Sequence, residues 1–227
     1  MTTFAGTGPA DVAGRAPVTT QPADTATVAA ALPVAIGDPA PLGLAAFGIT
    51  TLMLSSINAG WIGDAATPAV LALAIPFGGG AQLLAGMWAF RRGNTFAATA
   101  FTSYGAFWIS FFLLVQYFLA PIAANPLGGA ESVRTILGLY LFSWGVFTAY
   151  MFVASMAGAF AVRVVFGLLT LTFFALAIGE WQNSTGWHHL GGWLGVATAI
   201  AALYTSFADV TNANFKRTVL PTELPAK

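Results

Sequence analysis

Residues 159–179 read AFAVRVVFGLLTLTFFALAIG, and Arg163 is the single charged side chain among them. A helix needs about 20 consecutive apolar residues to cross a bilayer. Inside lipid no water is available for backbone N–H and C=O groups, and an α-helix satisfies these groups within one segment. The stretch therefore predicts a membrane-spanning helix.

Apolar blocks of similar length recur along the chain, at residues 41–60, 67–90, 95–119, 133–156 and 189–208. The whole chain is 57% hydrophobic and 7% charged, whereas roughly a quarter of the residues of a soluble domain are charged. Such a chain cannot cover itself with polar surface in water. The sequence predicts an all-α, polytopic integral membrane protein with six transmembrane helices.

The ends of the chain differ from this apolar part. Residues 1–37 are rich in Ala, Thr, Pro and Asp and contain no apolar run behind a basic start, so they are expected to form a disordered tail rather than a signal peptide. The transmembrane domain is expected at residues 38–211, and a second tail at residues 212–227.

Basic residues predict the orientation. Seven of the eight Lys and Arg residues fall on the side of the N-terminus, and only Arg134 falls on the other side. Basic loops stay in the cytoplasm, so both tails are predicted to be cytoplasmic in a cell-membrane protein.

Several functional classes are disfavoured by composition. The formal net charge is zero and the basic residues are scattered, which gives no electrostatic footprint for nucleic acid. The chain has no cysteine and two histidines, so no metal site or cofactor is expected. His188 and His189 are adjacent and do not share a helix face, and with Glu180 they are only a weak signal for a membrane enzyme. The segment EWQNSTGWHH (180–189) is better interpreted as an anchor at the membrane interface.

The charged residues of the apolar region fall at the ends of the blocks, so a solute would cross without a buried fixed charge. Polar and aromatic residues repeat at helical spacing within three blocks, which predicts faces turned toward one another or toward water. The alternative is that hydroxyl groups bond to their own helix and the rings only fill the bundle. These residues are Phe47, Thr51, Ser55 and Asn58, then Thr95, Thr99, Thr102, Tyr104 and Trp108, and then Tyr140, Ser143, Phe147 and Tyr150.

Small residues predict closely packed helices, as in GGGAQLLAG (78–86) and GGWLG (191–195). Gln82 is a lone amide in the first of these segments, and either a neighbouring backbone or a passing ligand could satisfy it.

The segment DPAPLGLAAFGITT (38–51) begins the first block. Asp38 as N-cap and Pro39 at the first helical position predict an abrupt helix start. Pro41 and Gly43 weaken the first turn. In one interpretation the segment only caps the helix. In the other it also leaves backbone N–H groups free near the pore entrance, where the N-terminus of a helix favours anions.

Six ordered segments resemble the acetate uptake transporters, the succinate-acetate permease family of bacteria, archaea and fungi. They are DPAPLGLAAFGITT (38–51) and GGGAQLLAG (78–86), followed by GNTFAATAFTSYGAFW (93–108), YLFSWGVFTAYMF (140–152), FALAIG (174–179) and FKRTVLP (215–221). The resemblance covers residues 38–221 and every predicted span.

This resemblance implies six-helix protomers that assemble as homo-hexamers, each with its own pore, and that pass acetate, related monocarboxylates or succinate with protons or in a channel-like manner. It implies a constriction made by Phe47, Tyr104 and Leu169. Asp38 stands where the family usually has Asn, and an acid there could repel an anion or take up a proton.

A carboxylate must lose water to pass an apolar constriction, which is costly for a bare charge. Donors on Thr50, Thr51, Ser103, Tyr104 and Gln82 could replace part of the hydration shell, or the acid could cross in its protonated form. We expect a mixture of both.

Two other functional classes are not excluded by composition. A channel for a neutral solute such as urea, an amide or ammonia would also use an uncharged six-helix pore. A helical receptor or scaffold is less compatible with inward polar faces.

Overall fold

The computed structural model describes residues 36–223, within one compact unit that begins at Ile36. Most of the tail predicted for residues 1–37 lies outside the described residues, as do the last four residues of the chain. The domain limits proposed from the sequence therefore stay predictions.

The described residues form helices and no strands, and six continuous helical stretches are long and apolar enough to cross a membrane. The first is α1 (Ala40–Asn58). The second runs through η1 (Asp64–Ala66), α2 (Thr67–Leu73), η2 (Ala74–Ala81) and α3 (Gln82–Arg91). The third combines α4 (Thr95–Leu113), η3 (Leu114–Phe118) and α5 (Leu119–Ala124). The last three are α6 (Ala130–Ser155), α7 (Phe160–Gln182) and α8 (Thr185–Phe215). The predicted all-α fold with six long apolar helices is confirmed.

Two of these spans contain wide π-helical turns that the apolar pattern did not predict, η2 and η3. Pro76 lies inside η2, where it cannot donate a backbone hydrogen bond and its ring conflicts with the carbonyl four residues earlier. Pro121 follows η3 by three residues, so its ring meets the carbonyl of Tyr117 in that wide turn. Wide turns relieve such conflicts without ending the helix.

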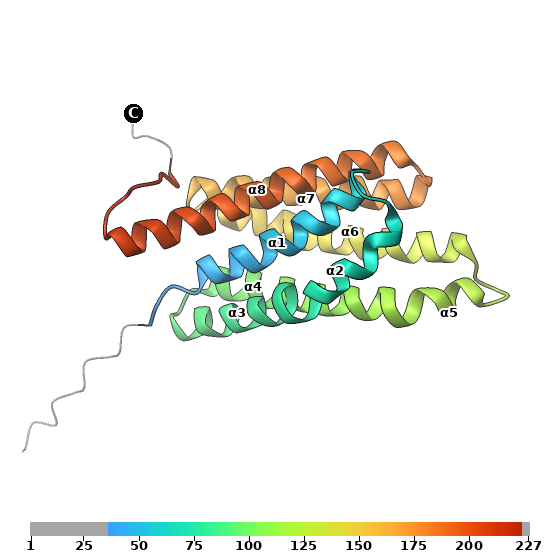
Figure 1. Ribbon diagram of the computed structural model, residues 1–227, viewed down its shortest axis with the longest axis horizontal. Helices are drawn as coiled ribbons and strands as arrows, with labels where there is room; N and C mark the ends of the chain where they lie inside the picture. The colour runs from blue at the N-terminus through green and yellow to red at the C-terminus, as the bar shows by residue number, and fades with distance from the viewer. Residues whose placement is uncertain (1–35, 224–227) are drawn as a thin grey trace, which may run out of the picture. The chain divides into compact units, whose positions relative to one another are not determined.

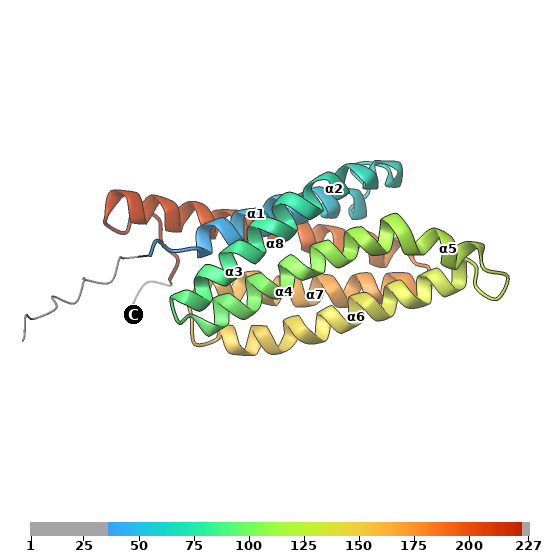
Figure 2. The same cartoon turned by 90° about the horizontal axis from the view of Figure 1, so that it is seen from below.

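The helices pack as neighbouring pairs (Figures 1 and 2). α1 lies against α8, α7 lies between α6 and α8, and α3 packs along α4. Glycines permit the close contacts that the small-residue segments predicted. A Cβ atom on Gly195 would lie 2.2 Å from Ser55 Oγ, and one on Gly86 would lie 2.2 Å from Thr102 Oγ1. Backbone packing of this kind holds helices together where lipid and core are equally apolar.

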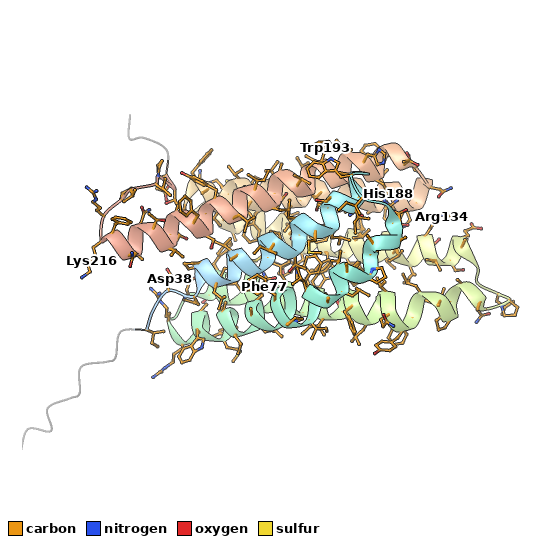
Figure 3. All side chains as sticks on the ribbon, in the orientation of Figure 1. Asp38, Phe77, Arg134, His188, Trp193 and Lys216 are labelled. Atoms are coloured by element: carbon orange, nitrogen blue, oxygen red, sulfur yellow. The ribbon has the colours of Figure 1, made fainter. Side chains whose placement is uncertain are left out.

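The two ends of the bundle carry different residues (Figure 3). Asp38 and Lys216 lie at one end, and His188, Trp193 and Arg134 lie at the other. We call these the Asp38 end and the His188 end. After α8 the chain turns back at the Asp38 end, where Asn212 Oδ1 accepts hydrogen bonds from the backbone N–H groups of Val219 and Leu220.

The start of α1 differs in detail from the prediction. The N-cap position is held by Pro39, and Asp38 Oδ1 accepts a hydrogen bond from the N–H of Ala40 at 3.0 Å. The N–H of Gly43 is not free, since it donates to Pro39 O at 3.1 Å. A Cβ atom at Gly43 would lie 2.5 Å from the ring of Phe101. The small residue in this segment therefore allows α1 to approach α4.

Candidate functional site

Two cavities lie within the bundle, one toward each end. The Asp38-end cavity has a volume of about 350 Å³ and is lined by α1, α3, α4, α7, α8 and the end of α6. The His188-end cavity has a volume of about 310 Å³ and is lined mainly by α1, α4, α6 and α7, with single residues of η1, α2, η3, α5 and the start of α8. Both volumes are near the lower limit for small-molecule sites. They suit ligands of few atoms.

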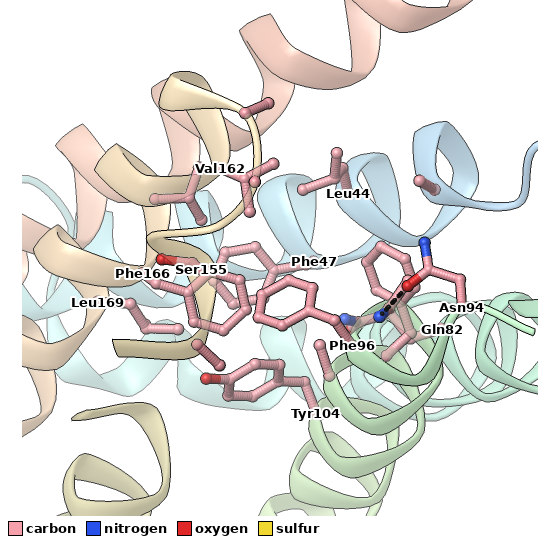
Figure 4. A pocket seen from close by; sticks show the side chains of 18 of the residues that line it. Leu44, Phe47, Gln82, Asn94, Phe96, Tyr104, Ser155, Val162, Phe166 and Leu169 are labelled. Carbon is pink, nitrogen blue, oxygen red and sulfur yellow. Dashed lines mark hydrogen bonds between the residues drawn. The ribbon is translucent and has the colours of Figure 1, made fainter. Parts of the chain in front are cut away.

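Three side chains line both cavities, and they come from three different helices. Among the described residues, only Phe47 of α1, Tyr104 of α4 and Leu169 of α7 belong to both linings. All three are buried, with 3–6% of their surface exposed. Figure 4 shows them around the Asp38-end cavity, with Phe166 and Phe96 beside them. An apolar partition of three side chains therefore separates the two cavities.

Tyr104 is held in this partition by contacts on several sides. Its ring lies 5.8 Å from that of Phe47, 5.4 Å from Phe147 and 6.1 Å from Phe166, measured between centroids. Its hydroxyl is 2.9 Å from Thr148 Oγ1. Because Thr148 also donates to Trp144 O, its hydroxyl accepts the proton of Tyr104. The ring is thus fixed by α6 as well as by its own helix.

Several polar groups in the cavity linings have no hydrogen-bond partner among residues 36–223. Gln82 is fully buried in the lining of the Asp38-end cavity, and neither its Oε1 nor its Nε2 forms a hydrogen bond. Thr51 Oγ1 and Trp108 Nε1 are likewise unpaired in the His188-end cavity. Buried polar groups usually have partners. These three residues therefore have unused hydrogen-bonding capacity, Gln82 on one side of the partition and Thr51 and Trp108 on the other.

Not every residue named from the sequence lies on the cavities. Thr50 is fully buried but donates to Ala46 O of its own helix, and it lines neither cavity. Ser103 lies in a separate shallow depression between α4 and α6, together with Ser143. The entrance residues lie at the Asp38 end outside the cavity lining, where Asp38 Oδ1 is 3.4 Å from Arg92 Nη1.

Ionisable side chains also line the cavities, and sequence reasoning gave them no role there. Asp209 lies at the Asp38-end cavity, and Asp64, Glu180 and His188 lie at the His188-end cavity. No Lys or Arg of the described residues lines either cavity. The indole N–H of Trp108 was also missed as a donor. Its spacing of four residues from Tyr104 was the available signal.

The described part of the chain contains no cluster of three His, Cys, Asp or Glu residues suited to a metal ion.

A model of the GPR1/FUN34/yaaH family matches residues 20–226. The chain is 42% identical to the succinate-acetate/proton symporter SatP of Escherichia coli K12 over 187 residues, which cover 82% of this chain and 95% of that protein. It is 36% identical to acetate permease A of Emericella nidulans, over 81% of this chain and 65% of that protein. A solved structure of the bacterial acetate channel SatP is 38% identical and has a TM-score of 0.74, over 83% of this chain and 99% of that one.

Proposed function

Because the chain belongs to the GPR1/FUN34/yaaH family, we propose that it is a membrane transporter or channel for acetate and related small carboxylates, including succinate. The relatives carry names of succinate-acetate symport, acetate permeation and an acetate channel. The observation that carries the proposal is the partition of Phe47, Tyr104 and Leu169, the three side chains common to both cavities. The substrate passes between them from one cavity to the other.

The partition selects small acids because of desolvation. A carboxylate that enters an apolar slot loses its hydration shell, and an unpaired charge in such a slot costs several kcal/mol. Gln82 on one side and Thr51 on the other replace part of that shell, since their polar atoms have no partner among the described residues. With no Lys or Arg among the described residues of the linings, the remaining cost is met by protonation of the acid. Transport is therefore proton-linked.

At the Asp38 end, an ion pair offsets a negative charge that would otherwise face arriving anions. Asp38 stands where the acetate uptake transporters usually have Asn, and its carboxylate lies 3.4 Å from the guanidinium of Arg92. The pair is exposed and screened by water, so it contributes little stability. It nevertheless reduces the net negative charge that an arriving carboxylate meets.

The membrane placement follows from the helices and the basic residues. The six apolar helices and the transporter relatives make this a multi-pass membrane protein. We place it in the cell membrane with both termini cytoplasmic, since Arg92 and Lys216 lie at the Asp38 end and the positive-inside rule applies there. We further propose a homo-hexamer with a pore in each protomer, acting without a cofactor and without catalysis.

Uptake of labelled acetate into proteoliposomes tests this function. The pH gradient and the membrane potential are clamped separately, and uptake into protein-free vesicles is subtracted. Proton-linked transport responds to the pH gradient at zero potential, whereas anion conduction responds to the potential at equal pH. Vesicles with protein that take up acetate no faster than empty vesicles would refute the proposal. Urea or ammonia flux in excess of acetate flux would support the neutral-solute channel instead.

A further inference from the structure

Two ionisable side chains meet in the lining of the His188-end cavity. His188 Nε2 lies 3.8 Å from Glu180 Oε1, and both residues line the cavity. Their side chains are 31% and 17% exposed. The pair is therefore partly covered by protein and still reaches water. Neither residue belongs to the partition.

The local fold brings these two residues together although they lie eight positions apart. Glu180 is in the last turn of α7 and His188 is in the first turn of α8. Asn183 reverses the chain between the helices in a left-handed conformation, at φ 46°. Gly179 permits the approach, because a Cβ atom there would lie 2.9 Å from Cδ2 of His188.

Other titratable groups surround the pair. Asp64 also lines the cavity and is close enough to interact electrostatically with His188, as Arg134 of α6 is with Glu180. Tyr140 also lines the cavity, but its hydroxyl is held by Ser110 Oγ at 2.7 Å. With neutral histidines, the charges of Glu180, Asp64 and Arg134 sum to −1. Each proton taken up by a histidine makes the site less repulsive to an anion.

His189 is the neighbouring histidine, but it faces another part of the structure. It does not line the cavity, and its ring lies against the turn at Gly60, where a Cβ atom would be 2.9 Å from Nε2. The two histidines of this chain therefore form a natural pair of test and control positions.

We propose that Glu180 and His188 form a proton-exchange site for carboxylates at the His188-end cavity. The inference rests on the proposed function and adds the residues that supply the proton. The proton on His188 Nε2, which faces Glu180 Oε1 at 3.8 Å, moves to a carboxylate oxygen of the substrate. The neutral acid then passes the partition, and the imidazole takes up the next proton from water. Glu180 stays a carboxylate and stabilises the imidazolium.

The assignment follows from the positions of the two residues along the path. A carboxylate that gains a proton in the cavity enters the partition of Phe47, Tyr104 and Leu169 without a charge, so the desolvation cost described above is avoided. Histidine suits the task, because its ordinary titration lies between about pH 5 and 8.

The experiment measures the pH dependence of acetate uptake at zero membrane potential in proteoliposomes, with uptake by empty vesicles subtracted. The variants are His188→Gln, Glu180→Gln and Glu180→Asp, and His189→Gln is the control. Elution of each variant in detergent as a single peak at the wild-type volume establishes that it is folded.

We expect Glu180→Gln to shift the pH of half-maximal uptake toward acid by about one unit, because the imidazolium loses its anionic neighbour. His188→Gln should remove the inflection that the imidazole contributes to the pH profile. Glu180→Asp should return part of the wild-type profile, and His189→Gln should move it much less than the two test substitutions, since His189 lies outside the cavity lining. A pair that only shapes the cavity would change the amount of uptake without moving the profile.

The possible outcomes separate the two proposals. Wild-type protein without uptake refutes the function itself. Wild-type uptake with unchanged profiles in His188→Gln and Glu180→Gln refutes the proton-exchange site alone, and so does an equal shift in His189→Gln. If one of the two test variants does not fold, the profile of the other decides.

Discussion

Replacement of Tyr104 by alanine should open the partition between the two cavities. The tyrosine ring is the element common to the aromatic contacts with Phe47, Phe147 and Phe166, at centroid distances of 5.8, 5.4 and 6.1 Å. Its removal joins spaces of about 350 and 310 Å³. The partition would then consist of Phe47 and Leu169 alone.

The size of the effect on selectivity follows from what an apolar slot can discriminate. One methylene in such a slot changes the transition-state free energy by about 1–3 kcal/mol, or roughly 10–200-fold in rate. Butyrate is two methylenes longer than acetate, so the ratio of butyrate to acetate uptake should rise at least about tenfold in Tyr104→Ala. The substitution should also lower the free energy of unfolding by about 3–5 kcal/mol, as for other large aromatic residues in cores.

Tyr104→Phe is the matched control for this prediction. It keeps the ring and loses only the hydrogen bond to Thr148, which costs about 1 kcal/mol of stability. Thr148 keeps its bond to Trp144 O, so no buried hydroxyl is left without a partner. The assay is competitive uptake of labelled acetate and butyrate by proteoliposomes. An unchanged ratio in a folded Tyr104→Ala protein would show that Tyr104 does not limit the passage.

Three further predictions concern the packing, the donors and the entrance. Gly43→Ala places a Cβ atom 2.5 Å from the ring of Phe101, and overpacking of this kind should cost about 1–3 kcal/mol of stability in thermal unfolding in detergent. Gln82→Met keeps the length of the side chain but removes its unpaired amide, so acetate uptake should fall about tenfold, the value of one hydrogen bond to a charged group. Asp38→Asn removes the partner of Arg92 and should change the unfolding free energy by less than about 1 kcal/mol, since exposed ion pairs contribute little.

Controls for these three predictions come from the same chain. Gly37→Ala has no atom within 4 Å of its new Cβ and should leave thermal unfolding unchanged. Thr170→Val removes a hydroxyl that bonds Phe166 O in its own helix, away from both cavities, so acetate uptake should stay at the wild-type level. Wild-type stability in Gly43→Ala, or uptake by Gln82→Met equal to that of Thr170→Val, would contradict the assigned roles. A large loss of stability in Asp38→Asn would mean that the ion pair is not screened by water.

The sequence by itself determined the fold class and the six spans, for a local physical reason. Each apolar run must satisfy its own backbone inside lipid, so length and composition are sufficient to predict a helix. The predicted ends of the helices were less exact. The last span runs to Phe215 rather than residue 208, and the third span continues to Ala124 through the wide turn before Pro121. Spacing had singled out Phe47 and Tyr104, but only the resemblance added Leu169 and grouped the three as a constriction.

Only the tertiary structure decided which face of each helix points inward. In water an apolar face identifies the core, but in a membrane the lipid and the core are both apolar, so the same pattern fits either rotation. Leu169 is 4% exposed whereas Leu171, two residues later, is 55% exposed. The same ambiguity explains why Ser103, named as a donor, lies away from both cavities. The meeting of Glu180 with His188 likewise depends on how tightly Gly179 lets α8 approach α7, and no run of residues in the sequence specifies that distance.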